Sequence, residues 1–223
     1  MQPGARDGLS AAPKRRFFAS YPDTATGHAI ESAMYAAHGV GPKAAENYQT
    51  ALTELRKHAT EAAPMLDQAF DLVPDEVAIE RHQITHTLAA LKSHAAESAL
   101  ERIAALPLPE PAADAASKHR EPDFENEVMI RYAAIDGLRD LALRGNARAL
   151  KSLEDLVNQS APGIRGYALQ AHTESLSASN AIDDALLARY WNLPQAQRVG
   201  IGVVRISAYD MPVQTPAPIQ EEP

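Results

Sequence analysis

Two histidines four residues apart, His82 and His86, have the residue type and spacing for metal chemistry. Residues four apart share one face of an α-helix, which is how a helix presents two imidazoles to a metal ion. The helix of a zinc protease carries a glutamate next to its first histidine, where this chain has Gln83. Further ligands could come only through the fold, from His58, Glu80 or His94. Two surface histidines explain the pair more simply, so we predict no metal, no cofactor and no catalytic residue.

Three arginines occupy the same position of a sequence repeat and could bind carboxylates or phosphates of a partner. Ile130-Arg131 is followed 34 residues later by Ile164-Arg165, and Arg81 precedes Arg131 by 50 residues. The guanidinium group is a planar fork of donors that matches such anions. We favour a structural role, in which each arginine bonds a carboxylate or a turn carbonyl of the adjacent repeat. Arg81, Arg131 and Arg165 remain the candidate partner-binding residues.

Residues 123–160 predict the two helices that would carry the central arginine. Apolar residues at steps of three and four indicate one stripe of a first helix: Val128, Tyr132, Ile135, Leu138 and Ala142. Glu127 and Arg131, like Asp140 and Arg144, are acid-before-base pairs four residues apart, which is the favourable orientation on a helix. A short turn follows, and Asn146 is the predicted N-cap of the second helix.

This helix pair repeats about every 34 residues. Asn146-Ala147 recurs as Asn180-Ala181, 34 residues later. The same offset maps one upstream apolar set onto the next: Leu66, Ala69 and Leu72 onto Leu100, Ile103 and Leu106. The offset of 50 between Arg81 and Arg131 equals one repeat of 34 residues plus 16. The segment 107–122 supplies these 16 residues and contains four prolines. Prolines forbid a continuous helix there, so we predict a loop inserted into one repeat.

The run 127–138, EVMIRYAAIDGL, followed by ALKSL at 149–153, resembles the short bacterial HEAT-like repeat. The resemblance implies a right-handed α-solenoid of about four to five antiparallel helix pairs, a fold that most often binds other proteins. Two copies depart from the pattern, with Thr85 in the place of Ile135 and Val199 in the place of the arginine. Tetratricopeptide repeats share the period, but their Trp, Leu-Gly, Tyr, Ala and Phe pattern is not found here.

The domain organisation follows from these repeats. We predict a flexible N-terminal arm at 1–20, a HEAT-like solenoid at 21–210 and a disordered proline-rich tail at 211–223. The first helix pair is divergent and would cap the solenoid. The segment 198–206 could be a strand by composition, but the repeat register favours a helix. Trp191 falls in register with Val157, so we expect it in the core and not at an interface.

Composition restricts the partners and the compartment. The chain carries 29 acidic and 21 basic residues, a net charge of −8, which argues against a nucleic-acid partner. It has no cysteine, which excludes disulfides and thiolate metal sites. No run of 18 apolar residues occurs, so we predict no membrane span. The apolar run at 17–19, which follows the basic residues at 14–16, is too short to be the core of a signal peptide. We therefore predict a cytoplasmic location by default. The location would be periplasmic or secreted if a signal has been removed.

The leading functional hypothesis is a non-enzymatic protein–protein interaction module. It would act as a scaffold, an adaptor or an inhibitor or immunity-type binder through the concave solenoid surface. Its partner would be another protein, and the net charge of −8 allows that protein to be basic. The alternative is a small-molecule or metal-dependent enzyme or lyase-like chaperone that uses His82, His86 and the arginine ladder.

Overall fold

Every regular element in the described part of the chain is helical. The computed structural model describes residues 17–109, 121–177 and 184–194. The α-helices are α1 (Ala25–Ala36), α2 (Ala44–Lys57), α3 (Ala59–Leu72), α4 (Ala78–Leu91), α5 (Glu97–Ala105), α6 (Glu121–Leu143), α7 (Ala147–Gln159), α8 (Pro162–Ser177) and α9 (Asp184–Trp191). Two 3₁₀ turns, η1 (Asp75–Val77) and η2 (His94–Ala96), precede α4 and α5. The predicted all-α class is therefore confirmed for these ranges.

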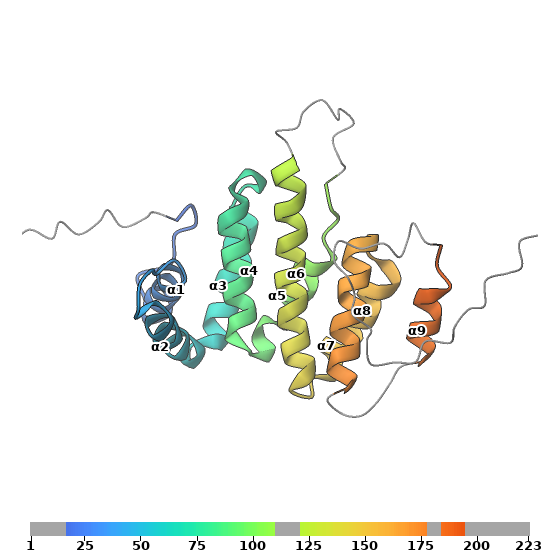
Figure 1. Cartoon of the computed structure of the whole chain (residues 1–223). Helices are drawn as coiled ribbons and strands as arrows, with labels where there is room; N and C mark the ends of the chain where they lie inside the picture. The colour runs from blue at the N-terminus through green and yellow to red at the C-terminus, as the bar shows by residue number, and fades with distance from the viewer. Residues whose placement is uncertain (1–16, 110–120, 178–183, 195–223) are drawn as a thin grey trace, which may run out of the picture.

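The helices follow one another across the molecule in chain order, from α1 and α2 at one end to α9 at the other (Figure 1). Helices α4, α6 and α8 pack side by side, and each also packs against its predecessor, α3, α5 or α7. Helix α6 is central, since it contacts α4, α5, α7 and α8. No helix in the described ranges is long and apolar enough to cross a bilayer.

The contacts of α6 explain why its buried surface is wider than one stripe. Val128, Ile135 and Leu138 are buried as predicted, but Ile130 and Ala134 on other faces are also fully buried. Gly137 permits the close approach of the neighbours, because a Cβ there would lie 2.8 Å from the Leu100 side chain and 2.9 Å from that of Ala89. A helix enclosed on several sides needs small residues at its crossings as well as an apolar stripe.

The turn between α6 and α7 forms as the sequence predicts. Gly145 has a φ of +88°, a left-handed conformation that glycine adopts without steric cost. Asn146 then caps α7, its side-chain oxygen accepting from the backbone amides of Arg148 and Ala149 at 2.9 and 3.1 Å. Its amide nitrogen donates to the buried carboxylate of Glu97, which ties the start of α7 to α5.

Some details differ from the expectations, and some expected elements lie outside the described residues. Leu72, predicted on an apolar stripe, is 61% exposed, since α3 ends there and the chain turns into η1. Thr85 is fully buried at the position equivalent to Ile135, because its hydroxyl donates to the Arg81 carbonyl oxygen within the helix. Asp140 pairs with Lys92 at 3.2 Å and not with Arg144. The predicted helix at 198–206, the tail at 211–223 and most of the 107–122 insertion lie outside the described residues.

The last residues of the predicted N-terminal arm are packed. Ala19 is buried, and the Phe17 ring lies 4.7 Å from the ring of Tyr35 on α1. The backbone amides of Phe18 and Ala19 donate to the two carboxylate oxygens of Glu80, at 2.7 and 2.9 Å. One buried carboxylate on α4 thus holds the chain as it enters α1.

Candidate functional site

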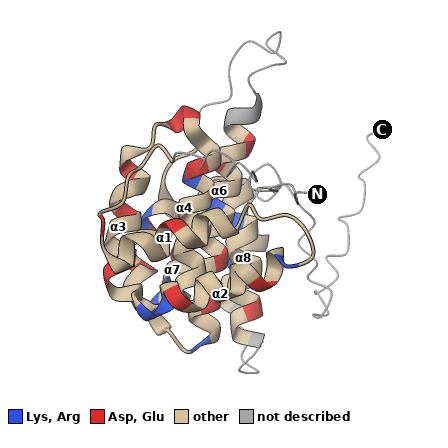
Figure 2. Ribbon diagram, turned by 90° about the vertical axis from the view of Figure 1, so that its left-hand side faces the viewer, with Lys and Arg blue, Asp and Glu red and all other residues tan. Residues whose placement is uncertain are grey.

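A surface groove of about 450 Å³ crosses α2, α4, α6 and α8. Each of these helices contributes polar or aromatic side chains to the groove. The groove residues that bear aromatic, imidazole or charged groups include Tyr48, Arg56, His82, His86, Lys92, Tyr132, Asp136, Arg139, Asp140 and Tyr167. Acidic and basic residues are otherwise interspersed over the ribbon (Figure 2).

The two histidines singled out by their spacing line this groove. Their rings lie 6.5 Å apart, and the His86 Nδ1 atom is hydrogen-bonded to the Tyr48 hydroxyl at 3.2 Å. His82 is half-buried, and this burial, together with the nearby His86, lowers the pKa of His82. The imidazoles are therefore accessible polar groups between α2 and α4.

A second aromatic pair lies at the α6–α8 end of the groove. The rings of Tyr132 and Tyr167 are stacked, with centroids 4.0 Å apart and planes inclined by 19°. The Tyr167 hydroxyl donates to Asp136 at 3.0 Å, and Arg139 pairs with the same carboxylate oxygen at 3.1 Å. Burial raises the pKa of Asp136, while burial and the adjacent Asp136 raise the pKa of Tyr167 to about 12.

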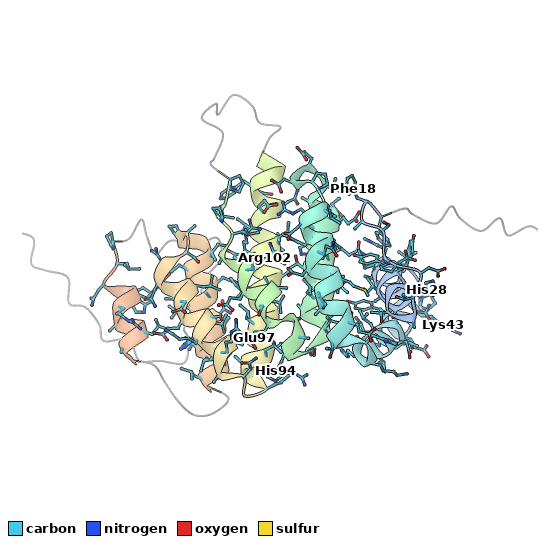
Figure 3. The ribbon with its side chains drawn as sticks, turned by 180° about the vertical axis from the view of Figure 1, so that it is seen from behind. Phe18, His28, Lys43, His94, Glu97 and Arg102 are labelled. Carbon is cyan, nitrogen blue, oxygen red and sulfur yellow. The ribbon has the colours of Figure 1, made fainter. Side chains whose placement is uncertain are left out.

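The other candidate metal ligands lie in separate clusters. His58 contacts Thr26 and Glu54, while Glu80 holds the N-terminal segment. Figure 3 shows His94 beside Glu97 at one end of the helices and Phe18 at the other. Across the described ranges, no three His, Asp or Glu side chains are grouped closely enough to hold a metal ion.

The three repeated arginines each bond acceptors in the connection between their own helix and the helix before it. Arg81 on α4 pairs with Asp75. Arg131 on α6 donates to the carbonyl oxygens of Leu106 and Pro107, at 3.2 and 3.1 Å. Arg165 on α8 donates to the carbonyl oxygen of Ser160 at 2.9 Å. Arg81 and Arg131 are buried. These contacts support the structural role, and direct binding of a partner by the three residues stays a prediction.

Arg81 and Arg131 also share one buried carboxylate. Glu127 lies 2.8 Å from Arg81 Nη1 and 2.6 Å from Arg131 Nη1, through its two different oxygens. Burial lowers the pKa of Arg131, while Glu127 acts in the opposite direction. The predicted Glu127–Arg131 pair is confirmed, but it belongs to an internal network and not to a solvated helix face.

Tyr190 and Trp191 occupy the C-terminal part of the described chain. Tyr190 is buried, and the Trp191 ring meets it edge-on at 5.4 Å. Trp191 is partly buried and packs against the core, as its repeat register predicts. A second cavity of about 550 Å³ lies between α5, α7 and the start of α8, bordered by Pro107 and Leu108 at the beginning of the insertion.

Sequence reasoning missed most residues of the groove. Tyr132 was placed on the apolar stripe, although it stands 50 residues after His82 and so occupies the same repeat position. Asp136 is related in the same way to His86. Comparison of the residues at repeat positions equivalent to His82 and His86 would have found Tyr132 and Asp136 as well. Arg56 carries no such signal, because α2 belongs to the divergent first pair.

Replacing Glu80 with glutamine should detach residues 17–19 from α4. Glutamine offers one acceptor oxygen where the carboxylate offers two, so one backbone amide loses its charged partner at a cost of about 1.5–3 kcal/mol. We expect faster hydrogen exchange at the amides of Phe18 and Ala19, measured by NMR, by about tenfold or more. Glu76→Gln, an exposed change on the preceding turn, is the control. Unchanged exchange in the Glu80 variant would show that the carboxylate does not hold the segment.

Comparison with protein-family models, with curated proteins and with solved structures found no match for this chain.

Proposed function

We propose that this protein is a non-enzymatic protein-binding module built as a right-handed α-solenoid of HEAT-like helix pairs. The repeat spacing of the sequence and the side-by-side packing of α4, α6 and α8 support this architecture. The observation that carries the function is the groove, whose lining comes from four helices and not from one loop or helix end. A surface of this kind offers a partner many contacts along its length.

The groove has the composition of a recognition surface. Tyrosine side chains bury large areas on binding while their hydroxyls satisfy polar groups, and aromatic residues are enriched among the anchors of interfaces. Met129, at the edge of the groove, is 51% exposed and provides adaptable apolar contact. In this proposal the net charge of −8 steers a basic partner toward the molecule, while the groove sets the contacts.

The role proposed for the three repeated arginines, Arg81, Arg131 and Arg165, is mainly structural. By bonding the connections α3–α4, α5–α6 and α7–α8, they tie α4, α6 and α8 to the helices before them and so help to shape the groove. Direct contact with a partner would require an exchange of their present hydrogen bonds, which is costly for the buried Arg81 and Arg131.

The test is capture of a protein partner with matched surface variants. We expect wild-type protein to bind a partner stoichiometrically and Met129→Asp to weaken the purified complex by about tenfold or more, because a charge replaces an apolar contact. Isothermal titration calorimetry measures the change. Ser98→Asp, an exposed substitution on α5, controls for added negative charge.

Equal weakening by Met129→Asp and Ser98→Asp would exclude the groove as the contact surface. Saturable binding of a small molecule to the groove, with no protein captured by wild type, would overturn the protein-binding proposal in favour of the His82 and His86 chemistry.

A further inference from the structure

The charges that line the groove do not balance at its α2–α4 end. Lys92 pairs with Asp140 at 3.2 Å, and Arg139 pairs with Asp136. Arg56 differs from both. Its Nε atom donates to the Ala90 carbonyl oxygen at 2.8 Å, and none of the ion pairs formed within the described ranges includes it. This end of the groove therefore holds a positive charge without a carboxylate partner.

The neighbours of Arg56 are hydrogen-bonding groups. Tyr48 lies two turns before it on α2 and is joined to His86 on α4. Arg56 and Tyr48 line the same groove. Burial raises the pKa of Tyr48, and the positive charge of Arg56 acts in the opposite direction. Ala90, the anchor of Arg56, lies one turn after His86, and His82 lies one turn before it. Tyr48, Arg56, His82 and His86 thus surround one seam.

We propose that this seam binds a carboxylate of the protein partner, held by the Arg56 guanidinium and by His86. The inference rests on the proposed function, since it names the group that the partner inserts. The bond from Nε to Ala90 fixes the guanidinium plane and leaves the two terminal nitrogens to form a fork on a carboxylate. The Tyr48 hydroxyl, which is hydrogen-bonded to His86 Nδ1, is a further group that can donate to the bound carboxylate.

Two observations favour a single carboxylate over a polyanion. The groove has one cation without an acidic partner, whereas nucleic acids are bound by rows of them. The chain as a whole is acidic, with a net charge of −8, which opposes binding of a highly charged chain. A basic partner protein also carries some carboxylates. The negative net charge of this chain can therefore attract such a partner, while Arg56 binds one of its carboxylates.

Binding should strengthen as the pH falls. The titratable and charged groups that face the two histidines are Tyr48 and Arg56 from α2, Lys92 after α4, Tyr132, Asp136, Arg139 and Asp140 from α6, and Tyr167 from α8. A carboxylate is attracted more strongly by an imidazolium than by a neutral imidazole. The affinity for the carboxylate should therefore rise as the pH falls and the imidazoles become protonated.

The probe is a capped diglutamate peptide, followed by NMR through the His82 and His86 ring signals. We expect saturable binding that is about tenfold weaker at about pH 8 than at about pH 6, on either side of the usual histidine pKa. Arg56→Gln should weaken binding about tenfold or more, and Arg56→Lys less, because lysine keeps the charge without the fork. His86→Ala, at an exposed site, should abolish most of the pH dependence without affecting folding. Arg144→Gln, an exposed arginine outside the groove, is the matched control.

Three results would overturn the inference. The capped diglutamine peptide should not bind, and binding equal to that of diglutamate would exclude recognition of charge. Binding of a phosphoserine peptide but not of diglutamate would assign the seam to phosphate. Wild-type affinity in Arg56→Gln would remove the proposed anchor. The peptide experiment needs no partner protein, so its failure is distinguishable from failure of the proposed function, which partner capture with Met129→Asp tests separately.

Discussion

Glu127→Ala is expected to lower the free energy of unfolding by about 3–5 kcal/mol, the cost of removing one member of a buried ion network. The substitution leaves two buried guanidinium groups, Arg81 and Arg131, without their shared carboxylate. Arg81 keeps Asp75, and Arg131 keeps two carbonyl oxygens, so the loss should not exceed this range. Urea denaturation followed by circular dichroism measures the change.

Two variants separate the charge of Glu127 from its position. Glu127→Gln keeps the shape and one acceptor but removes the charge, so we expect an intermediate loss. Glu125→Ala, on the same helix and exposed, should change stability by less than about 0.5 kcal/mol. If Glu127→Ala matched this control, the two arginines would be satisfied by their other partners, and the network would not stabilise the junction of α4 and α6.

The all-helical class was predictable because helix formation depends on local patterns. The apolar spacing and the cap predict two helices within 123–160, and α6 and α7 begin within two residues of the expected positions. The cap at Asn146 was equally predictable, since an N-cap depends only on adjacent residues. The burial of Ile130 was not, because it depends on which helices pack on the second and third faces of α6.

Tertiary partners account for the rest. The spacing of Glu127 and Arg131 predicts their contact, but nothing local indicates that Arg81, 46 residues earlier, joins the same carboxylate. The groove is a similar case. It combines α2, from the divergent first pair, with the regular helices α4, α6 and α8. A repeat register cannot place a residue of a helix that has no equivalent.

Phe70→Ala is the second change with a large expected effect, a loss of about 3–5 kcal/mol in the free energy of unfolding. Phe70 is 2% exposed, so the substitution removes a full aromatic ring from the core. The ring also lies under two guanidinium groups, with Arg81 Cζ at 4.5 Å and Arg102 Cζ at 5.7 Å from its centroid. Leu72→Ala, at an exposed site of the same helix, is the control.

Phe70→Leu separates volume from the cation–π contact. Leucine fills much of the space of the ring but cannot make the cation–π contact. The loss of unfolding free energy in Phe70→Leu therefore includes the contact with Arg81. The additional loss in Phe70→Ala reports the cost of the cavity. Because Arg81 also pairs with Glu127, a double-mutant cycle of Phe70→Leu and Glu127→Gln tests whether the two sites communicate. We expect a coupling energy of about 0.5 kcal/mol or more. If the two losses of unfolding free energy added exactly, Arg81 would keep its position over the Phe70 ring without Glu127. The contact of α4 with α3 and the contact of α4 with α6 would then contribute to stability independently.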